Sequence, residues 1–148
     1  MVARRVLDTL IELSGRHRDE AAGHAADARR ASDQVQAMKR QLQQYRAEYD
    51  ARSPVRAGQQ TGPQQIERHL RFVARLDYAI GDQERRHEQA RRVQAQREAE
   101  LIERQKRLKA FETLKLRRDQ ADARRQERHE QRLTDEQATR IHQRRTRT

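Results

Sequence analysis

Apolar residues recur along the first third of the chain in alternating steps of four and three positions. The seam they form has fourteen positions: Ala3, Leu7, Leu10, Ser14, His17, Ala21, His24, Ala28, Ala31, Val35, Met38, Leu42, Tyr45 and Tyr49. A period near 3.5 residues is typical of a helix that winds around a partner helix. The pattern therefore predicts a helix over about residues 3–52 with a coiled-coil seam.

This pattern stops at a short segment of turn-forming residues. Residues 53–63 read SPVRAGQQTGP and contain both prolines of the chain. Pro54 cannot continue a helix, and it pushes the residue before it toward extended geometry. Thr61 with Gln64 resembles a capping box, and Gly62 followed by Pro63 is nearly as good a helix start. We expect a loop over residues 53–63 and a second helix over about residues 64–140.

The second helix opens with an apolar stripe of its own, made of Ile66, Leu70, Val73, Leu76 and Ile80. The stripe thins through His87, Ala90 and Val93, recovers at Leu101, Leu108, Phe111 and Leu114, and ends after Leu116. A short loop between two long helices implies an antiparallel hairpin. The sequence predicts an all-α protein: a long antiparallel two-helix coiled-coil hairpin with an overhanging basic C-terminal helix.

Centring the turn near residue 58 places residue i of the first helix opposite residue 117 − i of the second. Tyr45 and Tyr49 then face Phe72 and Leu70, so we interpret Tyr45, Tyr49 and Leu70 as a clasp near the turn. The whole of residues 1–148 is expected to form one elongated domain. The order of residues 134–148 stays open: the interpretations are a frayed tail, and a fresh helix start where Thr134 with Gln137 resembles a second capping box.

Composition excludes several classes of protein. Only 33% of the residues are apolar and 39% are charged, which is too little apolar surface for a globular enzyme with a buried pocket. No apolar run approaches the roughly 18 residues of a membrane span. Cysteine is absent, and no secretory signal follows the N-terminal Met-Val-Ala-Arg-Arg, so we expect a cytoplasmic protein. No catalytic motif is present, and we expect no enzymatic activity, cofactor or metal.

The net charge of +11 suggests an acidic partner. The strongest basic stretch includes Arg117, Arg118, Arg124, Arg125 and Arg128, with carboxylates between them. Three interpretations stay open: a solvated helix, an acidic protein surface, and nucleic acid. No aromatic residue interleaves with these arginines, which disfavours nucleic acid. His17 and His24 are interpreted as polar seam positions that set the register of the helices.

Four groups of residues, in order and spacing, resemble the family of the flagellar export protein FliJ and its relatives in injectisome secretion. They are Tyr45-Arg46-Ala47-Glu48-Tyr49; then Phe72, Leu76, Ala79, Ile80 and Gln83; then Leu108, Phe111, Leu114 and Arg117; and finally Asp135-Glu136. The resemblance implies a non-catalytic component of the type III export apparatus, similar in architecture to the stalk of a rotary ATPase. Flagellar and injectisome systems are not separated by these residues.

The resemblance also implies partners. They are the hexameric export ATPase FliI, the export gate protein FlhA and the export chaperones, with peripheral association at the inner membrane through that machinery. Phe72 lies off the apolar stripe, so we expect an exposed ring that contacts the gate together with Leu76 and Ala79. Arg117, Arg118, Arg124, Arg125 and Arg128 are the candidates for the ATPase contact. Self-association through the heptads stays open.

Overall fold

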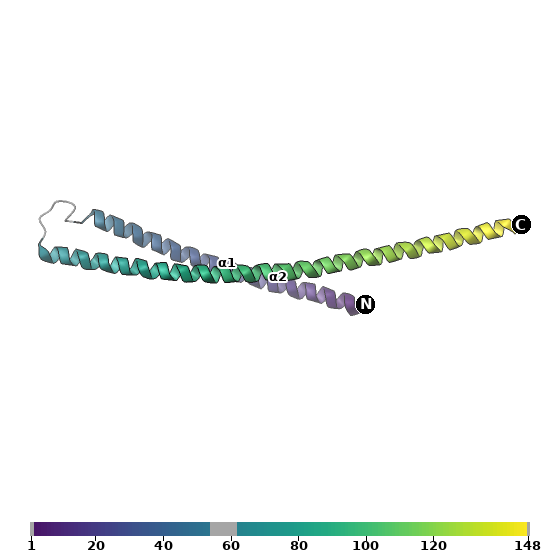
Figure 1. Cartoon of the computed structure of the whole chain (residues 1–148), viewed down its shortest axis with the longest axis horizontal. Coiled ribbons are helices and arrows are strands. Elements are labelled where there is room, and N and C mark those ends of the chain that lie inside the picture. The colour runs from purple at the N-terminus through teal and green to yellow at the C-terminus, as the bar shows by residue number, and fades with distance from the viewer. Residues whose placement is uncertain (1, 54–61, 148) are drawn as a thin grey trace. The chain divides into compact units, whose positions relative to one another are not determined.

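The computed structural model describes residues 2–53 and 62–147, and these residues form two long helices and no strand. Helix α1 spans Val2–Ala51 and helix α2 spans Pro63–Thr146 (Figure 1). The all-helical architecture agrees with the sequence prediction. Helix α1 ends within a residue of the expected position, whereas α2 runs about six residues further than the expected end near residue 140.

The boundaries of the helices follow from backbone hydrogen bonds. At the end of α1, the amide of Ser53 donates to the carbonyl of Asp50 at 3.1 Å. At the start of α2, the amides of Gln65 and Ile66 both donate to the carbonyl of Gly62. Gly62 is therefore the N-cap residue, with Pro63 at the first helical position, where its missing amide costs nothing. The alternative cap, Thr61, and the helix breaker Pro54 lie outside the described residues.

The tail does not break at Thr134. Its hydroxyl donates to the carbonyl of Glu130 at 2.9 Å, which is a bond within one continuous helix and not a cap. Thr139 bonds the carbonyl of Asp135 in the same way. The interpretation of residue 134 as a fresh helix start is therefore wrong, and α2 continues to Thr146.

The chain divides into two units by its internal contacts. The loop-end unit consists of His17–Arg104, and the terminal unit consists of Met1–Arg16 with Gln105–Thr148. Each unit contains a piece of α1 packed against a piece of α2. The division leaves the prediction of one elongated domain untested.

In the loop-end unit, the α1 residues that pack on α2 keep heptad spacing. Ala21, Ala25, Ala28 and Ser32 are buried. The half-buried residues that continue the 4-3 spacing are Val35, Lys39, Leu42, Arg46 and Tyr49. In the terminal unit the packed α1 residues are Leu7, Ile11 and Ser14. The seam is thus rich in small residues and in long basic residues whose aliphatic stems cover apolar surface.

Half of the predicted α1 seam lies on this packed line. Every seventh residue from Leu7 to Tyr49 is buried or half-buried. The alternate positions are mostly exposed; they are Ala3, Leu10, His24, Ala31, Met38 and Tyr45, with His17 half-buried. The prediction that His24 lies on the seam is therefore wrong. The apolar stripe of α1 is wider than the single line of contact that one partner helix offers, so one column of it is left outside.

On α2, the prediction holds for Val73, Leu76, Ile80, Leu108 and Phe111, which are buried or half-buried. It is wrong for four members of the predicted stripe that are exposed, namely Ile66, Leu70, Val93 and Leu114. Polar side chains occupy several of the packed positions instead, among them His69, Gln83, Gln94 and Arg104.

The register differs from the expected one by about six residues. Ion pairs join Lys39 to Glu84 and Arg46 to Asp77 in the loop-end unit, and Asp8 to Lys115 in the terminal unit. In each of these pairs residue i of α1 lies opposite residue 123 − i of α2, not 117 − i. The expected register followed from a turn centred near residue 58, which would bring the start of α2 into contact with α1. Residues 62–68 are instead all exposed, and packing begins at His69.

Candidate functional sites

The first candidate site is an aromatic cluster in the loop-end unit, formed by two α1 tyrosines and two α2 rings. The Tyr49 and Phe72 ring centroids lie 4.4 Å apart, and Tyr45 meets Phe72 edge-on at 6.2 Å. His69 stacks on Tyr49 at 5.0 Å with an interplanar angle of 11°. Aromatic pairs in these geometries contribute about 0.5–1.5 kcal/mol beyond the area they bury. The cluster therefore joins α1 to α2 where their packing begins.

The three residues expected to contact the export gate are packed more closely than the sequence suggested. Leu76 is buried, and Phe72 and Ala79 are half-buried. The expectation that Phe72 is an exposed ring outside the seam is wrong, because Tyr45 and Tyr49 reach across to it. The most exposed aromatic ring of this region is that of Tyr78, at 74% exposure, and Tyr45 is 50% exposed.

The predicted clasp is partly formed. Tyr45 contacts Phe72, as the predicted register placed it, and Tyr49, which that register placed opposite Leu70, contacts Phe72 as well. Leu70 is 61% exposed and does not take its expected place opposite Tyr49, which His69 occupies. A histidine at this position gave no signal in a search for apolar periodicity, so the sequence analysis missed it. Only the shifted register brings His69 onto the face that meets α1.

An ion pair lies beside the aromatic cluster. Arg46 of α1 donates two hydrogen bonds to the carboxylate of Asp77 in α2. The hydrogen bond and the negative charge of Asp77 raise the pKa of Arg46 above its ordinary value. Exposed pairs of this kind add little stability, because water screens them. Their contribution here is to favour one register over its neighbours.

The second candidate site is the terminal unit, where cross-helix ion pairs again join α1 to α2. Arg4 bonds Asp122 at 2.6 Å, and Lys115 bonds Asp8 at 2.9 Å. The hydrogen bond from Arg4 holds the pKa of Asp122 below its ordinary value, helped by the charges of Arg4, Arg125 and Arg118. The bond to Asp8 raises the pKa of Lys115. Both pairs lie on one flank of the helix pair, together with Asp119.

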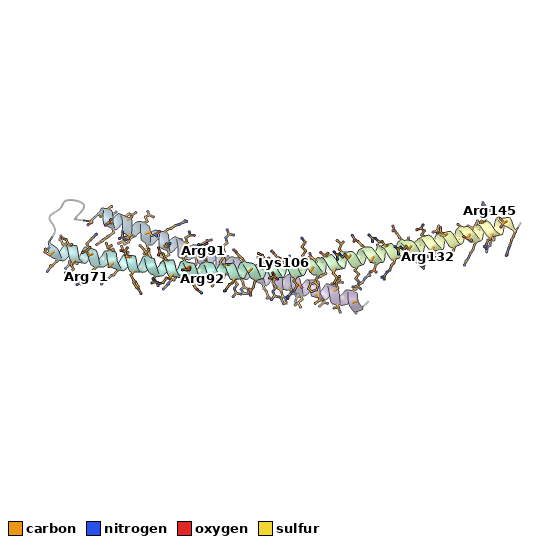
Figure 2. The ribbon with its side chains drawn as sticks, viewed as in Figure 1. Arg71, Arg91, Arg92, Lys106, Arg132 and Arg145 are labelled. Atoms are coloured by element: carbon orange, nitrogen blue, oxygen red, sulfur yellow. The ribbon has the colours of Figure 1, made fainter. Side chains whose placement is uncertain are left out.

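The arginines expected to contact the ATPase belong to the α2 part of the terminal unit. Arg118 is half-buried, while Arg117, Arg124, Arg125 and Arg128 are exposed. Every residue from Ala123 to Arg147 is exposed, and Figure 2 shows Arg132 and Arg145 on this stretch. Nothing in the structure tests which of these side chains meets a partner.

Other kinds of site were sought among the described residues. They contain no group of three or more histidine or acidic side chains placed to hold a metal ion. His24, which the sequence placed on the seam, is exposed, and His17 is half-buried. Neither helix, within the part of the chain described, has a stretch apolar enough to cross a membrane.

The two long helices packed together agree with the helical architecture that the FliJ resemblance implies. The family model described as flagellar FliJ protein matches residues 4–147, which is nearly the whole chain. The chain belongs to the FliJ family. Membership makes it a component of flagellar type III protein export. No curated protein and no solved structure matches the chain.

Proposed function

We propose that this FliJ family protein is a stalk that joins the flagellar export ATPase to the export gate and escorts export chaperones. The single observation that carries the proposal is the family match over residues 4–147. Two long paired helices, with candidate contacts in two different units, are what a stalk requires. The protein would work at the cytoplasmic side of the inner membrane, held there by the export machinery, and would have no catalytic role of its own.

The proposed gate contact is the α2 surface around Phe72, Leu76 and Ala79. Phe72 is half-buried, so part of its ring stays accessible while Tyr45 and Tyr49 fix its orientation. A ring held in place before binding loses little conformational freedom on binding, which suits an anchor residue. The tyrosines thus support the contact indirectly, by positioning the anchor.

The proposed ATPase contact is the basic part of α2, from Arg117 to Arg128. Arginines along an exposed helix would pair with carboxylates lining the pore of a ring, and an asymmetric rod would act on the ring subunits one at a time. Carboxylates between the arginines reduce the positive electrostatic potential of this part of the helix. Because the charges are exposed, we expect the association to weaken as the salt concentration rises.

One alternative keeps the fold and changes the partner. A nucleic-acid binder would use the same arginines against phosphates. The absence of aromatic side chains in residues 117–147 of the sequence removes the stacking surface that single strands use, which makes this the weaker alternative.

The deciding experiment measures ATP hydrolysis by the purified flagellar export ATPase with and without this chain. We expect stimulation, and we expect the triple variant Arg124→Glu, Arg125→Glu, Arg128→Glu to lose most of it. The matched control reverses three exposed arginines of the loop-end unit, Arg68, Arg75 and Arg91, and should retain stimulation. A chain that leaves hydrolysis unchanged but retards DNA or RNA in a salt-dependent way would contradict the proposal.

A further inference from the structure

The terminal unit contains an open apolar groove that the ion pairs and the basic tail do not explain. It runs between the two helices and is lined by Ala3, Val6, Leu7 and Leu10 of α1 and by Leu114, Arg117 and Arg118 of α2. Val6 is 52% exposed and Leu114 is 54% exposed. These side chains are large and apolar, yet the contact between α1 and α2 leaves them facing solvent.

The groove follows from the width of the apolar stripe at the start of α1. Val6, Leu10 and Leu13 are spaced four and three residues apart, as the residues of a helix–helix contact are. They lie beside the packed line of Leu7 and Ser14, and all three are exposed. One partner helix covers the packed line only. A second helix laid along the groove would cover the rest.

The shape of the groove selects the class of occupant. Its volume is about 820 Å³, within the range of small-molecule sites, but it is open along its length and encloses nothing. A small ligand would therefore keep much of its surface in water. A helix bound in a groove between two helices buries a continuous apolar face, and this is a common mode of peptide recognition.

Charge selects the occupant further, because the two flanks of the terminal unit differ. Arg117 and Arg118 border the groove, and Lys106 and Lys109 lie on the adjoining α2 surface that shares Leu114 and Arg117 with it. None of the described residues lining either surface is acidic. The carboxylates Asp8, Asp119 and Asp122 lie on the other flank, where Lys115 and Arg4 pair with two of them.

We propose that this groove binds an amphipathic helix of a partner protein, with the partner's apolar face on Val6, Leu10 and Leu114 and its acidic edge along Arg117 and Lys109. The inference goes beyond the proposed ATPase contact, because that contact is purely electrostatic and this one is anchored by apolar side chains. A second copy of this chain fits less well, since two copies meeting at this groove would bring Arg117 and Arg118 of both into proximity.

The test uses the full chain and a fluorescent synthetic helix of about 21 residues, with leucines on one stripe and glutamates along one edge. Two matched peptides replace either the glutamates by lysines or the leucines by serines. In fluorescence anisotropy, we expect the acidic peptide to bind and each matched peptide to bind at least about tenfold more weakly.

Variants of the chain locate the binding surface. We expect Leu114→Ser to lower affinity for the acidic peptide about tenfold, and Arg117→Glu to lower it and to weaken its salt dependence. The matched controls are Leu133→Ser, at a leucine that is 48% exposed on α2 but outside the groove, and Arg132→Glu. Both controls should bind as the parent chain does. All four altered residues are exposed, so circular dichroism should show unchanged helix content.

Three results would overturn the inference. Equal losses in groove and control variants would mean nonspecific attraction to a basic helix. A dimer in sedimentation that Leu114→Ser abolishes, without peptide binding, would make the groove an interface between copies. Binding to phosphatidylserine vesicles that Leu114→Ser abolishes, again without peptide binding, would make it a membrane surface. None of these measurements uses the ATPase, so the groove and the proposed stalk function stand or fall separately.

Discussion

Phe72 shows how one residue serves packing and recognition together. Its ring lies 4.4 Å from that of Tyr49 and meets Tyr45 edge-on, yet it is only half-buried. The residue is therefore part of the contact between α1 and α2 as well as a candidate anchor for the export gate. Loss of gate binding on substitution would report both roles, and the two have to be measured separately.

We expect Phe72→Ala to lower the free energy of unfolding by about 1–3 kcal/mol, less than a fully buried phenylalanine would cost. Tyr78→Ala, at the most exposed aromatic of the region, should change it by less than about 0.5 kcal/mol. Urea denaturation followed by circular dichroism measures both. Equal stability of the two variants would contradict the packing role. Gate binding per folded molecule then tests the anchor role.

The bond between Arg4 and Asp122 predicts a pH dependence. Since the pKa of Asp122 is lower in the folded chain than in the unfolded one, its contribution to stability is present above the ordinary aspartate value of about 3.9. That contribution is lost as the pH falls through the lowered value. Asp122→Asn should therefore melt slightly below the parent chain at pH 7, since water screens an exposed pair, and the gap should close as the pH falls through the lowered pKa of Asp122. Asp135→Asn, which removes no observed ion pair, should show no such gap at any pH.

At the level of the helices, the sequence was enough to predict which segments are helical. It was less informative about which faces of the two helices meet. Pro54 and the Gly62-Pro63 start made the break predictable, and the long heptad made α1 predictable. Half of the predicted seam positions of α1 lie on the packed line. Apolar periodicity identifies the apolar stripe, but it does not show which row of side chains within the stripe faces the partner helix. Small residues at positions 25 and 32 and basic stems at positions 39 and 46 decided that choice.

The register and the candidate sites were harder to predict for the same reason. The 123 − i register depends on where packing begins after the break, and the first seven residues after position 61 are all exposed. The aromatic cluster was largely foreseen, since Tyr45, Tyr49 and Phe72 do meet. His69 and the groove beside Leu7 were missed, because both depend on which column of side chains is left outside the contact.

The position of the seam can be tested at two alanines. Ala25 is buried on the packed line, whereas Ala31, which apolar periodicity alone placed on the seam, is exposed. Ala25→Leu should cost about 1–3 kcal/mol, because there is no room for a larger side chain between closely packed helices. Ala31→Leu should cost close to nothing, since both residues are good helix formers. Thermal melting of the two variants measures the difference, and a reversed order would place the seam where periodicity alone put it.

For the molecule as a whole, the buried residues and the fully exposed arginine-rich stretch lie in different segments. Among the residues that the structure describes, the buried ones all lie at or before Leu108, and every residue from Ala123 to Arg147 is exposed. The long exposed stretch of α2 is rich in arginine and contributes to the net charge of +11. A substitution in this stretch should therefore be able to change function without changing the stability of the fold.

Truncation after Ala123 should leave the free energy of unfolding within about 0.5 kcal/mol of the parent chain while keeping the Arg4–Asp122 pair. It should reduce stimulation of the export ATPase, and the loss should be largest at low salt, because exposed charges are screened within about 8–10 Å at physiological ionic strength. Hydrolysis and melting are measured on the same preparations. Full stimulation by the truncated chain would mean that the arginines beyond position 123 are not the contact.

Because α1 and α2 of the loop-end unit meet in the 123 − i register, the length of that unit can be changed only by matched deletions in both helices. Deleting residues 25–31 from α1 together with residues 92–98 from α2 removes one heptad from each helix and shortens each by about 10 Å. Within that unit the matched deletion keeps the residues of α1 opposite the same residues of α2, as in the pairs Lys39–Glu84 and Arg46–Asp77. Deleting either heptad alone shifts the two helices by one heptad on one side of the cut, so the single deletions should melt lower than the matched one. A partner whose activity depends on the length of the paired helices should respond less to the chain with the matched deletion, even though that chain stays folded.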